Sequence, residues 1–280
     1  MTRYSAIAFV LLAAGTANGA EKSLDRTFTV SPGGSLVVDA DSASVRVSGG
    51  DSNQVTVHMI AQGPEKELAD MKIEAAQKDD GVTVTMRRQE KSRWFNWNSW
   101  NGESRIEVTV PRRYQVSVRT GGGNVELADT TGTAKLQTSG GDIAARNVAG
   151  TLNARTSGGG IKADNIRGDV DADTSGGDVK LLNVDGKIRG NTSGGSVRVS
   201  LVGTNRGISA TSSGGDIEVI VPRATAGNFN ASTSGGGVKL EIPITTTEME
   251  DGRARGTLNG GGPSIEARTS GGNISLRAAD

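Results

Sequence analysis

The sequence predicts an all-β protein built as a single-stranded β-helix, and two observations carry that prediction. The first is a motif, Thr-Ser-Gly-Gly or a close variant, that recurs every 18 residues. A short unit repeated at a fixed interval is typical of a solenoid. The second is an alternation of apolar and polar residues within each unit, which is the period of a strand and not of a helix. We therefore expect about 18 residues per regular coil. The regular copies begin at Thr120, Thr138, Thr156, Thr174 and Thr192.

The unit from Thr151 to Gly168 shows how each coil is expected to fold. Leu152 and Ala154 share one parity with the motif threonine, and Ile161 follows after a glycine corner. A second corner is expected at Asp164-Asn165. Coils stacked about 4.8 Å apart would pair every strand with the strands above and below it, which makes parallel sheets. The expected internal columns are Leu152, Val170 and Ile188, and Ile161, Val179 and Val197.

The motif itself suggests a structural role for its glycines and hydroxyls. We expect the Gly-Gly pair at a corner where a positive φ or the close approach of the next coil excludes a Cβ atom. The hydroxyls before it are expected to bond to one another from coil to coil. After Ser212 and Thr233 the next motif begins only at Thr269, so one degenerate copy is expected between them.

The start of the chain and its composition point to an exported protein. Residues 1–20 have the charged, apolar and small-residue segments of a signal peptide, with cleavage after Gly19 or Ala20. The apolar run is too short to span a bilayer, and no retained transmembrane segment is expected. Cysteine is absent, which excludes a disulfide framework and a lipidated cysteine. Basic and acidic residues balance at 31 each, which argues against nucleic acid as a partner. We expect a periplasmic, secreted or cell-surface location.

Three parts follow from these patterns. Residues 1–20 are the signal peptide, residues 21–118 an irregular β-rich start of the solenoid, and residues 119–280 the regular β-helix. Within the irregular part, residues 63–71 are expected to form a short helix, with proline near its start and acids in its first turn. A hairpin turning at residues 78–81 should follow it.

Several of these features together resemble one bacterial family. Strands that end in Val-Pro, serial Thr-Ser-Gly-Gly blocks followed by Asp-Ile or Asp-Val, and a terminal Leu258-Asn-Gly-Gly-Gly-Pro263 segment are similar to the candidate adhesins called DUF4097. The resemblance extends from about Leu36 to Leu276. It implies a right-handed β-helix of the cell envelope, and it supplies no catalytic residues.

An aromatic segment is the feature that departs from this family pattern. All three tryptophans of the chain fall within seven residues, in a connection from about residue 90 to residue 104. Such a concentration is typical of a contact surface for a glycan, a protein or a membrane interface. The alternatives are a cap over an open end of the solenoid and a disordered excursion. The candidate binding residues here are Trp94, Phe95, Trp97 and Trp100.

Outward positions on the coils carry a second candidate site. Arg155 should lie beside Asp173, and Asp171 beside Arg189, which is ordinary cross-strand pairing. A further column is expected to bring like charges together, so that it either spreads into solvent or binds an anion. It consists of Lys162, Lys180 and Arg198, with Asp178 near enough to neutralise part of it.

Metal and catalytic chemistry find little support. Asp142, Asp178 and Asp216 follow glycine pairs and faintly resemble calcium-binding repeat loops, but other coils lack the acid. His58 should point to solvent and has neither a cysteine nor a serine motif to act with. No metal, cofactor or catalytic residue is predicted.

The leading hypothesis is a non-enzymatic, adhesin-like or envelope-associated binding protein whose partner is a glycan, an envelope component or a protein. A purely structural solenoid is one alternative. The other is an enzyme acting on polysaccharides through five acids: Asp164, Asp169, Asp171, Asp173 and Asp178.

Overall fold

The prediction of an all-β protein is confirmed. The computed structural model describes residues 8–9, 12–13, 20–88 and 102–279, and almost all regular structure in these ranges is β-strand. The chain divides into two compact units, residues 1–132 and 133–280, and each is taken by itself below. In both units, two layers of strands enclose a core of small and branched apolar side chains.

Unit 1 is strand-rich and mixes parallel with antiparallel pairs. One layer runs in the spatial order β3, β6, β9, β5, β11, and the other in the order β10, β4, β8, β7. The short strands β1 and β2 pair with β3. The elements are β1 (Ala8–Phe9), β2 (Leu12–Ala13), β3 (Ala20–Thr29), β4 (Ser35–Ala40), β5 (Ser44–Gly50), β6 (Gln54–Gly63), α1 (Glu65–Ala69), β7 (Met71–Lys78), β8 (Gly81–Arg88), β9 (Glu103–Pro111), β10 (Gln115–Thr120) and β11 (Val125–Thr131).

The helix and the hairpin of unit 1 lie close to their expected positions. α1 begins directly after Pro64, and its buried residue is Leu68. Lys22 of β3 donates through Nζ to the carbonyl of Leu68 near the end of α1 at 3.4 Å and to the carbonyl of Met71, the first residue of β7, at 2.6 Å. β7 then pairs antiparallel with β8. These contacts hold the helix against the first strand of the sheet.

Unit 2 is the regular solenoid. One layer runs β13, β15, β17, β19, β21, β27, β23, and the other runs β12, β14, β16, β18, β20, β26, β22, β25, β24. All neighbours pair in parallel, except those made by β25. The strands are β12 (Ala134–Gln137), β13 (Ile143–Ala149), β14 (Leu152–Arg155), β15 (Ile161–Arg167), β16 (Val170–Asp173), β17 (Val179–Asp185), β18 (Ile188–Asn191), β19 (Val197–Leu201), β20 (Ile208–Thr211), β21 (Ile217–Val221), β22 (Gly227–Ser232), β23 (Val238–Glu241), β24 (Thr245–Glu250), β25 (Arg253–Leu258), β26 (Ser264–Arg268) and β27 (Ile274–Ala278).

The register of the parallel strands follows the sequence repeat. Ile161 pairs with Val179, which pairs with Val197, and each of these residues is 18 positions from its neighbour. On the other layer, Val170 lies between Leu152 and Ile188 in the same way. All six side chains are buried. Their alternation along each strand places one apolar row from each layer inside the coil.

The motif threonines do not bond to one another, and that expectation was wrong. The buried motif hydroxyls instead donate to backbone carbonyls of the coil that stacks against them, as those of Thr120, Thr156, Thr174, Thr192, Ser212, Thr233 and Thr269 do. Thr156 Oγ1 donates to the Gly141 carbonyl at 2.8 Å, and Thr174 Oγ1 to the Gly159 carbonyl at 2.7 Å. Thr156 Oγ1 also accepts a bond from the Gly159 amide of its own motif. One hydroxyl thus satisfies a donor and an acceptor at a buried corner, where an unmade bond costs about 1–3 kcal/mol.

The motif glycines are required by close approach and not by a positive φ. None of the residues with positive φ is a glycine of a Thr-Ser-Gly-Gly motif. A Cβ atom on the second glycine of a motif would nevertheless meet the backbone of the stacked coil. At Gly177 it would lie 2.4 Å from the Gly159 oxygen, and at Gly159 only 2.1 Å from the Gly141 oxygen. The first glycine has more room, since the same contact at Gly158 is 3.3 Å.

Positive φ occurs at the other corner of the coil, as the Asp164-Asn165 expectation allowed. Asn147, Asn165 and Asn183 have φ of 53°, 55° and 53°, each 18 residues from the next. Asparagine tolerates this left-handed conformation better than most residues. The Asn165 side-chain amide also donates to the Asn147 side-chain oxygen at 2.8 Å, and that of Asn183 donates to Asp164 Oδ1 at 2.9 Å, so corner side chains bond from coil to coil.

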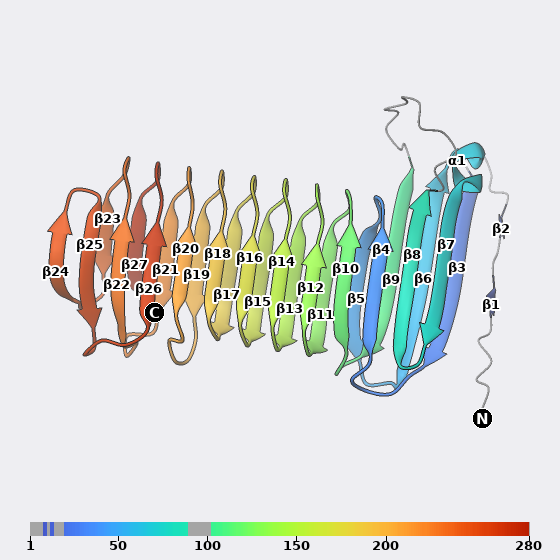
Figure 1. Cartoon of the computed structure of the whole chain (residues 1–280), viewed down its shortest axis with the longest axis horizontal. Helices are drawn as coiled ribbons and strands as arrows, with labels where there is room; N and C mark the ends of the chain where they lie inside the picture. The colour runs from blue at the N-terminus through green and yellow to red at the C-terminus, as the bar shows by residue number, and fades with distance from the viewer. Residues whose placement is uncertain (1–7, 10–11, 14–19, 89–101, 280) are drawn as a thin grey trace. The chain divides into compact units, whose positions relative to one another are not determined.

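The expected degenerate copy between Thr233 and Thr269 is absent from the structure, and the stacking order differs from the chain order. Residues 245–258 form the antiparallel pair β24 and β25 instead of a coil. The coil of β26 and β27 then lies between two earlier ones, because β26 pairs with both β20 and β22, and β27 with both β21 and β23. Figure 1 shows β26, red as the end of the chain, between the orange β20 and β22.

Glycine 177 provides a direct test of the close approach. Gly177→Ala should lower the free energy of unfolding by roughly 1–3 kcal/mol, because the new methyl group overpacks the contact with Gly159. Gly237→Ala is the matched control, since nothing lies within 4 Å of a Cβ atom there. Chemical denaturation monitored by circular dichroism measures both. Equal midpoints for the two variants would contradict the role assigned to the second glycine.

Candidate functional site

The predicted basic column forms on the outer face of unit 2. Lys162 of β15 pairs in register with Lys180 of β17, which pairs with Arg198 of β19. All three residues are exposed. In each strand, the residues on either side of the cation are buried apolar residues of the core. The three cationic side chains therefore lie on the same, outer side of the sheet. Three cationic side chains therefore lie about one strand spacing apart, roughly 4.8 Å between neighbours.

Neighbouring acids compensate two of these three cations. Lys180 Nζ lies 3.3 Å from a carboxylate oxygen of Asp178, and Arg198 lies 3.2 Å from Glu218 of β21. Lys162 makes no ion pair within the described part of the chain. Glu218 also lies 2.7 Å from Arg277, so it neutralises Arg198 only in part, and Lys162 at the other end of the column is uncompensated. Any anion that it binds should approach the Lys162 end.

The acids that follow the glycine pairs accept hydrogen bonds from the backbone of the stacked coil. Asp142 Oδ1 accepts from the Gly160 amide at 2.7 Å, and Asp178 Oδ1 accepts from the Ser196 amide at 2.9 Å. That amide bond, followed by the bond and charge of Lys180, holds the pKa of the Asp178 carboxyl below its usual value. These carboxylates have a structural role, and within the described residues no group of three or more His, Cys, Asp or Glu could hold a metal ion.

The five acids considered for polysaccharide cleavage do not meet in one cluster. Asp164 lies on β15 in one layer, whereas Asp171 and Asp173 lie on β16 in the other. Asp171 also has Arg155 at 3.3 Å and Arg189 at 3.8 Å. These acids are close to one another in the sequence. Consecutive strands of one coil belong to opposite layers, however, so the acids are separated in the structure.

The predicted pairing on the layer that contains β16 agrees with the register. Arg155 pairs with Asp173, and Asp171 with Arg189. The ion pair of Arg155 is diagonal, however, and goes to Asp171. In unit 1, His58 lies on the outer side of β6, half-buried, with its Nδ1 in contact with the Asp25 carboxylate.

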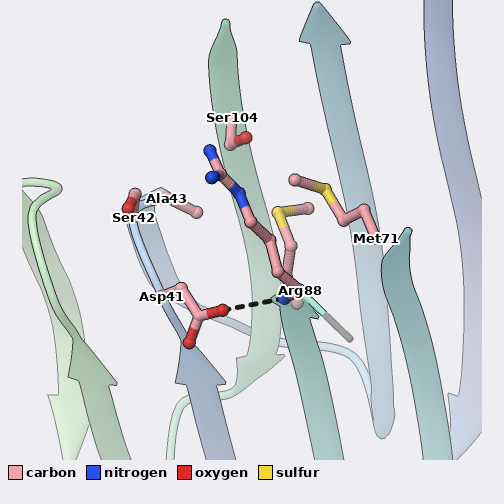
Figure 2. Close-up of a pocket in the computed structure, with 7 residues that line it drawn as sticks. Asp41, Ser42, Ala43, Met71, Arg88 and Ser104 are labelled. Carbon is pink, nitrogen blue, oxygen red and sulfur yellow. Dashed lines mark hydrogen bonds between the residues drawn. The ribbon is translucent and has the colours of Figure 1, made fainter. Parts of the chain in front are cut away.

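The four aromatic candidates, Trp94, Phe95, Trp97 and Trp100, lie outside the described residues. The strand ends on either side of that segment are described, and they line a small pocket with Met71 and the corner residues 41–43 (Figure 2). Asp41 accepts a bond from the Arg88 amide at 2.8 Å there. The pocket has a volume of about 10 Å³, which is room for about one water molecule. It cannot hold a ligand.

A second hollow near the same strand ends is one that the sequence reasoning missed. Ile60, Gln62, Glu103 and Arg105 line an open depression of about 110 Å³ on β6 and β9. Arg105 lies 2.9 Å from Glu103, so its guanidinium is paired. The single sequence signal was Ile60, an apolar residue at an outward position of an alternating strand.

Sequence comparison assigns the family. The family model described as Toastrack DUF4097 matches residues 34–277. The chain belongs to the Toastrack DUF4097 family. This confirms the resemblance that the motifs and the terminal Leu258–Pro263 segment had indicated.

Solved structures that match the Toastrack chain do so at low sequence identity. A candidate adhesin from Bacteroides fragilis is 14% identical, with a TM-score of 0.44 over 92% of this chain and 97% of that one. A candidate lipid-binding protein from Parabacteroides distasonis is 14% identical, with a TM-score of 0.47 over 94% and 98%. A candidate adhesin from Parabacteroides merdae is 10% identical, with a TM-score of 0.38 over 92% and 96%.

No curated protein matches the Toastrack chain. In the ranges that the structure describes, no helix has the length and the apolar character needed to cross a membrane.

The Asp178 bond predicts a pH-dependent contribution to stability. Because the pKa of this carboxyl is lowered in the folded chain, its stabilisation is present at neutral pH and is lost as the pH falls through the folded value, below the usual 3.8. Wild type should therefore melt above Asp178→Asn at pH 7, and the difference should vanish in stronger acid. Thermal melts from pH 7 to pH 2.5 measure this.

Lys180→Ala is the control for the cause of that effect. It keeps the Ser196 amide bond, which is the larger cause, and should retain most of the pH dependence. A melting difference between wild type and Asp178→Asn that stayed constant down to pH 2.5 would contradict the assignment.

Proposed function

We propose that this Toastrack chain is an exported, non-enzymatic binding protein that attaches to an anionic polymer of the cell envelope through the outer face of its solenoid. The observation that carries the proposal is the exposed column of Lys162, Lys180 and Arg198 on three adjacent strands. A polymer with regularly spaced negative charges can follow such a column along the stacking direction. A pocket is not needed for this kind of recognition, because each coil adds one contact.

The charge distribution supports a weak contact at each coil. The total affinity then comes from repeating that contact along the stacked coils. Exposed ion pairs are worth only about 0–1 kcal/mol each. Lys180 and Arg198 must also exchange their present partners, Asp178 and Glu218, for the ligand. Lys162 has no such partner to give up within the described residues. The affinity should therefore be modest, sensitive to salt and dependent on Lys162 most of all.

Export is part of the same proposal. The predicted cleavage after Gly19 or Ala20 falls at the first residue of β3, the first long strand of unit 1. Cleavage after Gly19 would leave this strand whole, and cleavage after Ala20 would remove only its first residue. We further propose a right-handed coil, a boundary near residue 118 between the irregular and regular parts, and a periplasmic, secreted or cell-surface location. No cofactor is part of the proposal.

The aromatic segment is proposed as a second contact. The argument is one of composition, since four of the nine aromatic residues of the chain lie between Trp94 and Trp100. Tryptophan is also the residue type most enriched among those that dominate binding energy. Two residues of the open depression, Glu103 and Arg105, follow this segment closely in the sequence.

The basic column can be tested with a charged polysaccharide. The triple variant Lys162→Ala, Lys180→Ala and Arg198→Ala should bind dextran sulfate about tenfold more weakly than wild type, a loss of about 1.4 kcal/mol. The binding of wild type should fall as salt is added, and unsubstituted dextran should not bind. Surface plasmon resonance at two ionic strengths measures these affinities.

The matched control removes the same charge from the other layer of unit 2. Lys135→Ala, Arg155→Ala and Arg189→Ala delete three cations from β12, β14 and β18. If this control lost as much affinity as the column variant, net charge and not the column would be the cause. A column variant with unchanged affinity would overturn the proposal.

The aromatic segment needs its own experiment. Replacing Trp94, Trp97 and Trp100 together by Ala should leave the melting temperature and the β-sheet spectrum unchanged and abolish binding to a glycan array. Replacing the same residues by Phe is the control, because it keeps an apolar ring at each position. A collapse of stability in the Ala variant would identify the segment as a cap, as the sequence alternative holds.

A further inference from the structure

The coil of residues 264–278, called here the inserted coil, occupies a slot between two coils that precede it in the chain. On one side it meets the coil of β20 and β21, and on the other the coil of β22 and β23. β20 and β22 are therefore not neighbours, and nor are β21 and β23. In the described sheets, the strands of these two coils pair with the inserted coil and not with one another.

The hydrogen bonds that recur between stacked coils of the solenoid also form on both sides of this slot. Thr269 Oγ1 donates to the Gly215 carbonyl at 2.8 Å, and Thr233 Oγ1 donates to the Gly272 carbonyl at 2.7 Å. The side chain after the glycine pair is also shared. The Asn273 backbone amide donates to Asp216 Oδ1 at 2.7 Å, and the Asn273 side-chain oxygen accepts a bond from the Gly237 amide at 3.0 Å. The slot thus binds the inserted coil through backbone groups of that coil and through the side chains of Thr269 and Asn273.

Apolar residues complete the fit of the inserted coil. Ile265, Ala267, Ile274 and Leu276 are all fully buried. Ile265 lies between Ile208 and Phe229 in register, so the slot continues the internal column from both sides. An empty slot would expose this column and four strand edges to water, which costs stability and invites pairing with another chain.

The connection to the inserted coil resembles a hinge. Residues 259–263 lead from β25, on one side of β22, to β26, on the other. Asn259, Gly260 and Gly261 have φ of 44°, 84° and 87°, a run that glycine adopts readily and most residues do not. The segment is mostly exposed, and hydrogen bonds to its ends hold it. Asn228 Nδ2 donates to the Gly262 carbonyl and Asn205 Nδ2 to the Pro263 carbonyl, both at 2.9 Å, and the Asn259 side-chain amide donates to two carbonyls of residues 223–225.

We propose that the slot accepts the inserted coil of a second copy of this chain, so that two copies exchange residues 264–278 through the hinge at 259–263. Every contact that the slot makes is independent of which copy supplies the coil. Exchange therefore changes only the hinge, which makes it a low-cost route to a dimer. Complementation of one sheet by a strand from another chain is an established mode of association. The proposal is independent of the binding function.

A shortened hinge is the first test. β25 and β26 flank β22 and so lie about 9.6 Å apart, two strand spacings. Deleting Gly260–Pro263 leaves only Asn259 between Leu258 and Ser264, which spans at most about 7 Å. The coil could then no longer reach the slot of its own copy. We expect the deletion variant to be a dimer with an unchanged β-sheet spectrum, whereas a hinge lengthened by four Gly and Ser residues should give less dimer than the natural hinge.

Light scattering after size exclusion gives the mass, and circular dichroism shows whether the fold persists. A folded, monomeric deletion variant would overturn the proposal. Because the deletion could instead unfold the chain, a second test keeps the natural hinge. It uses the absence of cysteine, which makes an engineered pair the sole source of cross-links.

The second test places Ser209→Cys and Glu266→Cys on paired positions of β20 and β26 in the full chain. After refolding from denaturant and oxidation, intrachain bonds give a monomer on a non-reducing gel, and exchanged coils give a covalent dimer. We expect the dimer fraction to rise with the protein concentration during refolding. The control pair Lys135→Cys and Asn153→Cys joins β12 and β14 and should stay intrachain. Intrachain bonds alone in both pairs, at every concentration, would overturn the proposal.

Discussion

The close approach of stacked backbones at the second glycine of each motif is the constraint on which the rest of the fold depends. A side chain at Gly177 would occupy the place of the Gly159 carbonyl of the coil below. Once the backbones are that close, water is excluded from the corner, and the carbonyl needs another donor. The hydroxyl of Thr174 supplies it. Glycine and threonine are therefore two parts of one requirement, and the small apolar core fits the narrow coil that results.

The sequence could predict what repeats and could not predict what departs from the repeat. The spacing of Ile161, Val179 and Val197 was sufficient to place them in one column, because parallel strands in register carry the sequence interval into space. The position of the inserted coil could not be predicted. Thr269 begins a motif like any other, and bonds from threonine hydroxyls to backbone carbonyls do not distinguish which coil of the chain lies next to it.

The same distinction applies to the candidate site. The column of Lys162, Lys180 and Arg198 follows from the regular spacing, and so does the pairing of Lys180 with Asp178. The neutralisation of Arg198 by Glu218 does not, because the interval between coils lengthens there from 18 to 20 residues. The acids considered for catalysis failed for the opposite reason. They are close in sequence, but consecutive strands of a coil alternate between layers. Acids on consecutive strands therefore lie on different layers of the structure.

The out-of-order stacking of the inserted coil has a consequence for how the chain acquires its structure. A solenoid whose coils follow the chain can grow by adding each coil to the last, with only local loops to close. That growth stops at β21, because β22 and β23 have no partner in the existing stack of coils until residues 264–278 have been made, although β22 can already pair with β25. During synthesis or translocation, the final portion must therefore fold in one step, with strand edges exposed until then. This is the interval in which pairing with another chain competes with correct folding.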